Sequence, residues 1–404
     1  MSIVTGKRII LGVSGGIAAY KVAELARQLT LDGAIVDVIM TEAARRFVGE
    51  ATFQALTGRP VLTDMWALPE DGVVGHVALA QHADAVVLAP ATANTLARLA
   101  AGLSDDLLTT TVLATTAPIL CVPAMNTSMY ENPATQENIA TLRRRGMTVL
   151  EPAVGRLAEP MIGKGRMPEV AVIEGELRAL LGRTYGPLRG RRVVVTAGGT
   201  HEPIDPVRFI GNRASGRMGY ALATEARDRG AQVTLISGPT LLPPPPAVDL
   251  VQIETALELR EAVHAAITGA DLLIMNAAVA DFRPAQMIDQ KIKKGDAEEL
   301  TLRLVRNPDI LAELADRHDL IKIGFAAETE NLLEYARSKV ARKGLDLVVA
   351  NDAVASIGQE QIQVLLVDAE GVRQLPRQPK EQAAAAIIDE VLRRWPERLA
   401  PRDR

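Results

Sequence analysis

Three loops in the first half of the chain combine small and hydroxyl-bearing residues, a composition suited to binding phosphate. Ser14–Gly16 follows an apolar run, Thr41 follows a second run and Pro90–Thr95 follows a third. Small residues let a phosphate approach backbone N–H groups at the positive end of a helix dipole. Each loop also has a plain structural explanation, since a tight turn favours glycine and Thr41 can cap a helix. Three such loops together favour an anion site.

Two further polar residues in this half could act on a substrate. His76 lies in DGVVGHVALA and Asn126 in PAMNTSMY. Imidazole titrates near neutral pH, which suits proton transfer. A lone histidine is more often a helix cap or a surface residue, and an asparagine after a strand is often a turn residue. The residue types alone therefore leave both assignments open.

The second half carries another set of loops with polar and basic residues. Ala197–Thr200 is a second phosphate-type turn, and the arginines of Asp205–Gly219 suggest an anionic ligand. Asp281 follows a predicted strand and can accept hydrogen bonds from a base or a ribose. Lys291–Lys294 is a short cationic run, although such runs usually face solvent.

These loops are predicted to lie at the carboxyl ends of strands in parallel sheets. In the first half we predict strands at residues 8–13, 35–40, 85–89, 119–122 and 147–150, and a helix at 18–31. In the second half we predict strands at 191–196, 232–237, 271–275, 322–324 and 346–350, with 363–367 as an extension or an edge strand. Strands alternating with helix-length segments indicate βαβ units. Ligands of such sheets bind beyond the strand carboxyl ends.

Length and composition predict two domains of the α/β class. The chain has 404 residues, and 48% of them are apolar while only 3% are aromatic. Cores built from Ala, Val, Leu and Ile are typical of parallel sheets covered by helices. The segment 181–190 has the glycine, proline and basic residues of a connector, so we predict domains at 1–188 and 189–404.

Charge and cysteine content exclude several classes of protein. The net charge of −4 gives no sign of the basic face that nucleic-acid binding requires. One cysteine, Cys121, excludes an internal disulfide and a cysteine-rich zinc site. The apolar run near the N-terminus ends at Ser14–Gly16, and no segment reaches transmembrane length. We therefore expect no membrane contact and a cytoplasmic location.

The motifs of the first half resemble the flavin-dependent cysteine decarboxylase family over about residues 5–170. The motifs are SGGIAAYK, the Gly-His pair at His76, PATANT, PAMN and GKGRMPE. The resemblance implies a flavodoxin-like Rossmann fold that binds FMN at a subunit interface of a trimer. It places Ser14, Gly15, Gly16, Thr41, Ala91, Ala93 and Asn94 around the FMN. It makes His76 the essential histidine and assigns the substrate carboxylate to Asn126.

The implied chemistry is oxidation of a cysteine sulfur to a thioaldehyde, which then accepts the electrons left by CO2 loss. Two positions depart from the family pattern. Glu159 stands where some members carry a cysteine that donates a proton, so Glu159 is the candidate donor here. Tyr130 stands where a tryptophan is common. Cys121 lies within an apolar strand and is predicted to be a buried structural thiol.

The motifs of the second half resemble phosphopantothenate–cysteine ligase over about residues 190–395. They are TAGGT, DPVRFIGNRASGRMG, NAAVADFRP, KIKK, NPDIL, GFAAET and VANDA. The resemblance implies attack of the 4'-phosphopantothenate carboxylate on the α-phosphate of CTP, followed by attack of the cysteine amine on the acyl-cytidylate. Both halves in this order resemble the bifunctional bacterial coenzyme A biosynthesis family. The expected fold is two Rossmann-like α/β domains.

The ligase resemblance also assigns site residues. It assigns the acyl-cytidylate to Asn212 and places Lys291 near the reacting phosphates, where Mg2+ is also expected. No residue is assigned to the Mg2+. The CTP site is predicted to contain Met275, Asn276, Ala277, Asp281, Lys291, Asn307, Pro308, Asp309, Ile310, Phe325, Lys339 and Lys343. Phe209 stands where a tyrosine is frequent. Ligase dimers joining decarboxylase trimers would give a dodecamer.

Two other functions remain as alternatives. A flavin-binding regulatory subunit would keep the flavin loops but lose the histidine or the PAMN motif, and this chain keeps His76 and Asn126. An NAD(P)-dependent oxidoreductase would carry GxGxxG and a ribose-binding acid, and this combination is not found in the sequence.

Overall fold

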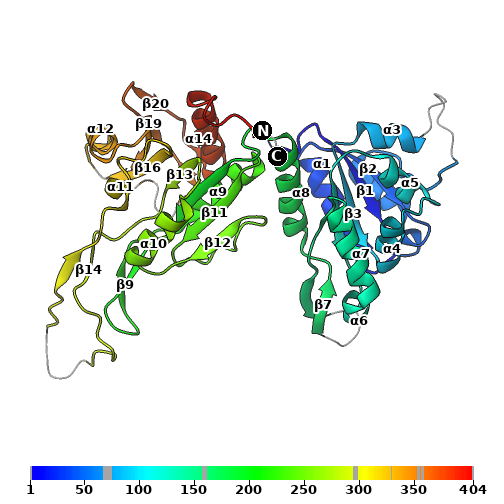
Figure 1. Ribbon diagram of the computed structural model, residues 1–404, viewed down its shortest axis with the longest axis horizontal. Coiled ribbons are helices and arrows are strands. Elements are labelled where there is room, and N and C mark those ends of the chain that lie inside the picture. The colour runs from blue at the N-terminus through cyan, green and yellow to red at the C-terminus, as the bar shows by residue number, and fades with distance from the viewer. Residues whose placement is uncertain are drawn as a thin grey trace. The chain divides into compact units, whose positions relative to one another are not determined.

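The computed structural model describes residues 2–66, 75–156, 162–293, 299–328, 330–352, 355 and 359–402. The chain divides into two compact units, Met1–Thr184 and Tyr185–Arg404, each with its own sheet (Figure 1). Among the described residues, no helix is long and apolar enough to cross a membrane.

The sheet of the first unit contains five parallel strands in the order β2-β1-β3-β4-β5. The strands are β1 (Arg8–Val13), β2 (Ile35–Met40), β3 (Ala85–Ala91), β4 (Ile119–Pro123) and β5 (Thr148–Val149). They are rich in Ile, Val and Leu and are buried along nearly their whole length, as strands covered on both faces must be. This order is that of flavodoxin-like folds.

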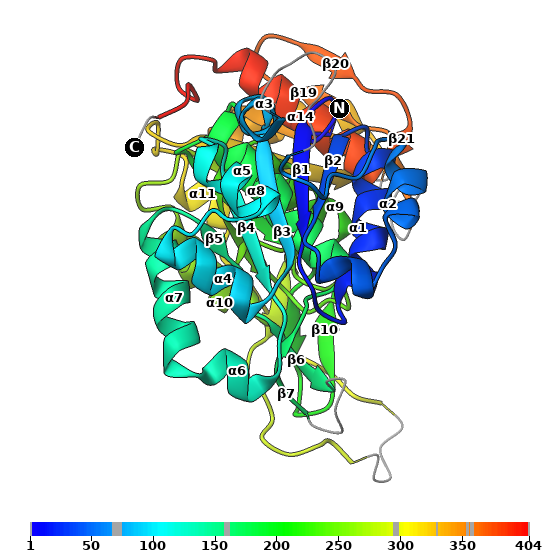
Figure 2. The same cartoon turned by 90° about the vertical axis from the view of Figure 1, so that its right-hand side faces the viewer.

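Helices cover both faces of this sheet (Figure 2). One core lies between the sheet and α1 (Ala19–Leu31), α2 (Glu50–Thr57) and α8 (Val170–Tyr185). The other involves α4 (Ala93–Ala101), α5 (Leu107–Ala114), α6 (Thr127–Glu131) and α7 (Pro133–Arg144). The remaining elements are η1 (Ala44–Arg46), α3 (Gly75–His82), which packs against α5, and a hairpin of β6 (Ala153–Arg156) and β7 (Ile162–Arg166).

The sheet of the second unit has the order β12-β11-β8-β13-β16-β17-β19-β20. Six strands are parallel: β8 (Arg192–Ala197), β11 (Gln232–Ser237), β12 (Asp249–Gln252), β13 (Leu272–Met275), β16 (Ile321–Glu328) and β17 (Leu347–Asp352). Numbered along the chain, these six run 3-2-1-4-5-6, the Rossmann order. β19 (Leu365–Val367) and β20 (Val372–Gln374) extend the sheet in antiparallel fashion.

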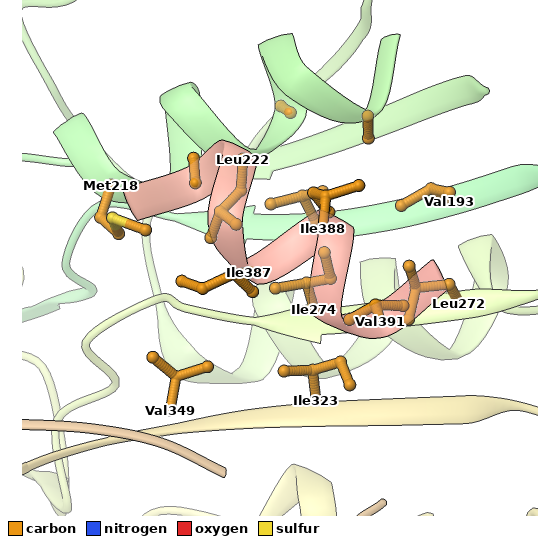
Figure 3. Packing of buried hydrophobic residues seen from close by; sticks show 14 of the residues in the cluster. Val193, Met218, Leu222, Leu272, Ile274, Ile323, Val349, Ile387, Ile388 and Val391 are labelled. Atoms are coloured by element: carbon orange, nitrogen blue, oxygen red, sulfur yellow. The ribbon is translucent and has the colours of Figure 1, made fainter. Parts of the chain in front are cut away.

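Two layers of helices cover the second sheet as well. On one face, α9 (Arg217–Asp228) and α14 (Lys380–Arg394) bury apolar side chains against the strands. Figure 3 shows Leu222, Ile387 and Val391 of these helices in one cluster with Ile274 and Ile323 of the sheet. The other face is covered by α10 (Ala256–Ala266), α11 (Ile310–Glu313) and α12 (Leu332–Lys343).

Three two-stranded pairs lie outside this sheet. They are β9 (His201–Pro203) with β10 (Phe209–Gly211), β14 (Phe282–Pro284) with β15 (Leu304–Arg306), and β18 (Gln361–Ile362) with β21 (Gln378–Pro379). The aromatic rings of His201 and Phe209 stack at 3.7 Å between centroids, which joins β9 to β10.

The predicted α/β class with parallel sheets is confirmed, and the differences concern the ends of elements. β16 and β17 run beyond the predicted residues 324 and 350, because their last residues still pair with each other. β5 covers only two of the four predicted residues. The segment 363–367, left open as an extension or an edge, contributes the antiparallel β19, and β20 lies outside it.

Candidate active sites

The first unit contains a cavity of about 880 Å³ beyond the carboxyl ends of its strands, within the range of cofactor sites. Its walls come from the loops after β1, β2, β3 and β4 and from the β6–β7 hairpin. The lining includes Ser14, Gly15, Gly16, Thr41, Ala93, Asn94, Asn126, Met129, Arg156 and Arg166. Six of the seven residues predicted around the FMN are therefore together. The exception, Ala91, is fully buried at the end of β3.

A buried hydroxyl group links two of these loops. Ser14 Oγ donates to Pro90 O at 2.5 Å and accepts from Thr92 N at 3.1 Å. Thr92 in turn caps α4 by accepting from Thr95 N. Because Ser14 is almost fully buried, losing these bonds would leave polar atoms unsatisfied. The Ser14 hydroxyl therefore holds the loop after β1 against the loop after β3.

The loop after β1 packs closely against the loop after β2, and only a glycine fits at position 15. A Cβ atom at Gly15 would lie 2.4 Å from Ala43 Cβ and 2.8 Å from the Ala43 carbonyl carbon. At Gly16 it would lie 3.5 Å from Thr92 Cγ2, an ordinary contact. Ala18, which precedes α1, has no side-chain acceptor for the first turn. Ala19 N and Lys21 N already donate to Gly16 O and Ala18 O, each at 3.0 Å, so an anion here would be attracted mainly by the positive end of the helix dipole.

Asn126 and His76 have different positions relative to this cavity. Asn126 lines it and accepts from Ser128 N at 2.8 Å as the N-cap of α6. His76 belongs to α3 and is not among the residues that line the cavity. Its Nδ1 atom is buried and has no hydrogen-bond partner within the described ranges of the chain. Glu159 lies outside the described residues.

An ion pair between Glu151 and Lys164, to which Tyr130 donates a hydrogen bond, holds the β6–β7 hairpin beside the cavity. Tyr130 Oη donates to Glu151 Oε2 at 2.8 Å, and Lys164 of β7 lies 2.5 Å from the same oxygen. Lys164 and then Arg143 lower the pKa of Glu151 to about 2. Cys121 is buried in β4, and burial raises the pKa of its thiol to about 12. A thiol in that state is not an effective acid or nucleophile.

The second unit contains a cavity of about 780 Å³, here called the ligase cavity, again at the carboxyl ends of parallel strands. Asn212 lines it, together with every residue predicted for CTP except Lys291. These are Met275, Asn276, Ala277, Asp281, Asn307, Pro308, Asp309, Ile310, Phe325, Lys339 and Lys343. The lining also includes Arg217, one of the arginines predicted to meet an anionic ligand. Glu328, Asn351 and Lys380, to which the sequence analysis gave no role, line it too.

Hydrogen bonds made by three side chains shape the loop that follows β13. Thr196 Oγ1 accepts from the backbone N–H groups of Asn276 and Ala277, each at 3.0 Å. Asn307 Nδ2 donates to Ala280 O at 2.8 Å. Asn212 Nδ2 lies 3.2 Å from the carbonyl oxygens of Ala278 and Val279 and donates to both. Segments from three separate parts of the chain are thus held together.

Two lysines of α12 bring positive charge to this cavity. Lys339 Nζ donates to Phe325 O, and Lys343 pairs with Asp309 at 3.0 Å. Burial and then the nearby Lys343 lower the pKa of Lys339 to about 8. Burial opposes a low pKa at Asp309, but the Lys343 ammonium outweighs it and lowers this pKa. Anionic phosphates would be stabilised here.

Lys291 lies outside the lining of the ligase cavity. Its neighbour Ile292 is fixed from two sides, because Ile292 N donates to Asp205 Oδ2 at 3.1 Å and Ile292 O accepts from Arg208 Nη2 at 3.1 Å. The cationic run is therefore anchored to the loop between β9 and β10. Among the described residues, no group of three or more His, Cys, Asp or Glu side chains is arranged to hold a metal ion.

Two Rossmann-type units, each with a phosphate-type cavity at the strand carboxyl ends, define a two-site α/β protein. Family models agree with this division: residues 3–182 match the model described as Flavoprotein. Residues 188–394 match the model described as DNA/pantothenate metabolism flavoprotein C-terminal domain.

Curated relatives cover almost the whole chain. The chain is 47% identical over 397 residues to the coenzyme A biosynthesis bifunctional protein CoaBC of Vibrio cholerae, with 96% of this chain and 98% of the relative covered. It is 52% identical over 360 residues to the CoaBC protein of Mycobacterium tuberculosis, with 85% and 86% covered. The chain belongs to the family of bifunctional coenzyme A biosynthesis proteins, CoaBC.

Solved structures match each half separately. The C-terminal domain of a CoaBC protein matches with 38% identity and a TM-score of 0.46, covering 52% of this chain and 99% of that one. A PPC decarboxylase mutant in complex with pantothenoylaminoethenethiol matches with 33% identity and a TM-score of 0.39, covering 43% and 97%.

Proposed function

We propose that this chain catalyses two consecutive steps of coenzyme A biosynthesis. Residues 189–404 join cysteine to 4'-phosphopantothenate with CTP, and residues 1–188 decarboxylate the product to 4'-phosphopantetheine on FMN. Membership of the CoaBC family supports both steps. The observation that carries the ligase assignment is that eleven of the twelve predicted CTP residues meet in one cavity with Asn212.

The ligase reaction needs a site that brings two anions together. A carboxylate oxygen of 4'-phosphopantothenate attacks the α-phosphorus of CTP, the bond to the β-phosphate breaks, and pyrophosphate leaves. Lys339 and Lys343 reduce the repulsion between the two substrates. The cysteine amine then attacks the acyl carbon and CMP leaves, with Asn212 beside the acyl-cytidylate.

Mg2+ and Lys291 complete the proposed ligase site. Because the described residues offer no cluster of metal ligands, Mg2+ would arrive bound to the phosphates of CTP. Lys291 would approach the reacting phosphates from the loop anchored at Asp205. This role requires a closer approach than the structure has.

The first cavity fits FMN. The positive end of the α1 dipole suits its phosphate, and Ser14, Thr41, Ala93 and Asn94 would surround the cofactor. When bound, FMN supplies oxidation of the cysteine sulfur, which makes loss of CO2 feasible. Asn126 would hold the substrate carboxylate, and His76 would move a proton.

His76 does not line the cavity of its own chain, which supports a site completed by another copy of the chain. We therefore propose that the first domain forms trimers with FMN at subunit interfaces. Ligase dimers would join these trimers into a dodecamer. The cytoplasmic location also stays a prediction.

Product analysis by mass spectrometry tests the whole proposal. Purified protein receives 4'-phosphopantothenate, cysteine, CTP and Mg2+. Appearance of 4'-phosphopantetheine is the expected result and would also establish that Glu159 in the cysteine position permits turnover. Accumulation of 4'-phospho-N-pantothenoylcysteine alone would contradict the decarboxylase assignment. Untouched CTP and no product would contradict the ligase assignment. Failure to decarboxylate supplied 4'-phospho-N-pantothenoylcysteine as well would favour a regulatory flavoprotein.

A further inference from the structure

A buried lysine that the ligase motifs do not include lies in the wall of the ligase cavity. Lys380 is the first residue of α14, and only 6% of its surface is exposed although it lines the cavity. Its backbone N–H donates to Glu360 O at 3.2 Å, which fixes the start of the helix. The lysine side chain therefore leaves a rigid element.

Three features of the surroundings oppose a positive charge on Lys380. Burial removes water from the ammonium group, and a helix N-terminus carries a positive partial charge. Arg217, the first residue of α9, lines the same cavity and adds a second positive charge. Burial and then Arg217 lower the pKa of Lys380, and Glu381 only partly opposes them. An anion in the cavity would offset all three effects.

The backbone around Lys380 and Arg217 also favours an anion. The helices α9 and α14 pack against each other, and residues at the start of each line the cavity. Gly216 and Pro379, which precede these helices, make no side-chain cap hydrogen bond. Lys380 N already donates to Glu360 O, but both helices, 12 and 15 residues long, present the positive ends of their dipoles at residues that line the cavity.

Lys380 and the lysines of α12 reach the cavity from different faces of the sheet. The helices α9 and α14 belong to the core on one face, whereas α12 belongs to the core on the other. One cationic wall therefore cannot replace the other. Both ligase substrates carry phosphate, so a second cationic wall has a use that Lys339 and Lys343 do not fill.

We infer that Lys380, together with Arg217, binds a phosphate group of a ligase substrate on the α9–α14 side of the ligase cavity. This inference rests on the proposed ligase function. The phosphate belongs either to the β- and γ-positions of CTP or to 4'-phosphopantothenate, and binding measurements separate the two sources.

The test measures dissociation constants of the full-length protein and of a Lys380→Met variant by calorimetry. Ligands are CTP, CMP, 4'-phosphopantothenate and pantothenate. A charge-assisted contact predicts a loss of about 10- to 100-fold for the ligand whose phosphate Lys380 binds. Weaker CTP binding with unchanged CMP binding assigns the β- and γ-phosphates. Weaker 4'-phosphopantothenate binding with unchanged pantothenate binding assigns the 4'-phosphate.

Unchanged affinity for both CTP and 4'-phosphopantothenate in a folded Lys380→Met variant would overturn the inference. Lys380→Arg should keep most of the affinity because it keeps the charge. Arg317→Gln removes an exposed cation that pairs with Asp319 outside the cavity, and it should change neither constant. The thermal transition of the second domain, compared with that of the wild type, reports whether each variant is folded.

Two further outcomes keep the inference separate from the proposed function. If Lys380→Met does not fold, Arg217→Gln takes its place, since the Arg217 side chain is exposed. If the wild-type protein releases no pyrophosphate from CTP, the ligase function itself fails. If the wild type is active and both variants bind like it, only the phosphate site fails.

Discussion

The two cavities differ in charge and in how much of each predicted site they bring together. Among the described residues, four basic and two acidic side chains line the first cavity. Seven basic and three acidic side chains of the described residues line the ligase cavity. The larger excess of basic over acidic side chains in the ligase cavity suits a reaction between a triphosphate and a second phosphate-bearing anion. The first cavity lacks its predicted histidine, whereas the second lacks only Lys291. The proposed first site would need His76 from a second copy, and the proposed ligase site would rely on charge neutralisation.

The largest expected effect is on the first site. His76→Asn removes the group assigned to proton movement in the oxidation step, so decarboxylation should fall by about 10²- to 10⁴-fold. Flavin absorbance and ligase activity should remain, because His76 lines neither cavity of its own chain. His82→Asn changes the same residue type on the same helix and should remain active. Full activity of His76→Asn would remove this histidine from the mechanism.

Asn212→Asp tests the ligase site next. Asn212 donates to the carbonyl oxygens of Ala278 and Val279, and a carboxylate in its place would be repelled by both. We expect ligated product to fall by about 10²-fold, with a smaller loss of pyrophosphate release. Asn331→Asp makes the same change outside the cavity and serves as control. Normal ligation by Asn212→Asp would exclude the assigned role.

A pair of glycine variants tests the flavin cradle. Gly15→Ala forces the loops after β1 and β2 apart, because the new Cβ would meet Ala43 at 2.4 Å. Overpacking of this kind costs about 1–3 kcal/mol, so flavin affinity should fall by roughly 5- to 150-fold. Gly16→Ala makes only an ordinary contact with Thr92 and should lose much less. Flavin content of the purified proteins checks the difference, and equal retention in both would contradict the cradle.

The pH dependence of CTP binding tests the charge of the ligase cavity. The pKa of Lys339 is about 8, below its ordinary value of 10.5. The charged form is therefore disfavoured by folding, and the stability of the free protein should rise as pH increases through this interval. CTP favours the charged form, so its affinity should fall about tenfold from pH 7 to pH 9.

Two lysine variants identify the group responsible for the fall in CTP affinity with rising pH, here called the pH slope. Lys339→Met should bind CTP weakly and lose the component of the slope that begins near pH 8. Lys343→Met should move that component to higher pH, because Lys343 contributes to lowering the pKa of Lys339. Calorimetry at several pH values measures both. If CTP affinity still falls in the same way with pH in Lys339→Met, a group other than Lys339 causes the fall.

The smallest expected effect concerns the β6–β7 hairpin. Tyr130→Phe removes one hydrogen bond to Glu151, which still pairs with Lys164 and Arg143. The loss should be about 1 kcal/mol of stability, read as a lower thermal transition of the first domain. Tyr335→Phe removes an exposed hydroxyl in the second domain and should leave that transition in place. Equal transitions for Tyr130→Phe and wild type would mean that water replaces the bond.

Much of each site could be predicted because the relevant signals are local. The apolar runs that form β1, β2 and β11 coincide with the predicted strands, since alternation and burial are written in consecutive residues. The loops after those strands carry the phosphate-type residues. Parallel strands place such loops at one edge, so gathering Ser14 with Asn94, or Asp281 with Phe325, followed from pattern and topology rules.

The sequence by itself determined the α/β class, the strand-end loops and the residue types available for phosphate binding. Only the tertiary structure decided that His76 lies outside the lining of the first cavity of its own chain. It also decided that Lys380 and Arg217 line the ligase cavity together. Lys380 opens a helix near the end of the chain and carries no motif around it that predicts a ligand. Its position depends on how α14 packs against α9 and the sheet, and such long-range packing is set by the burial of many side chains together rather than by any short segment.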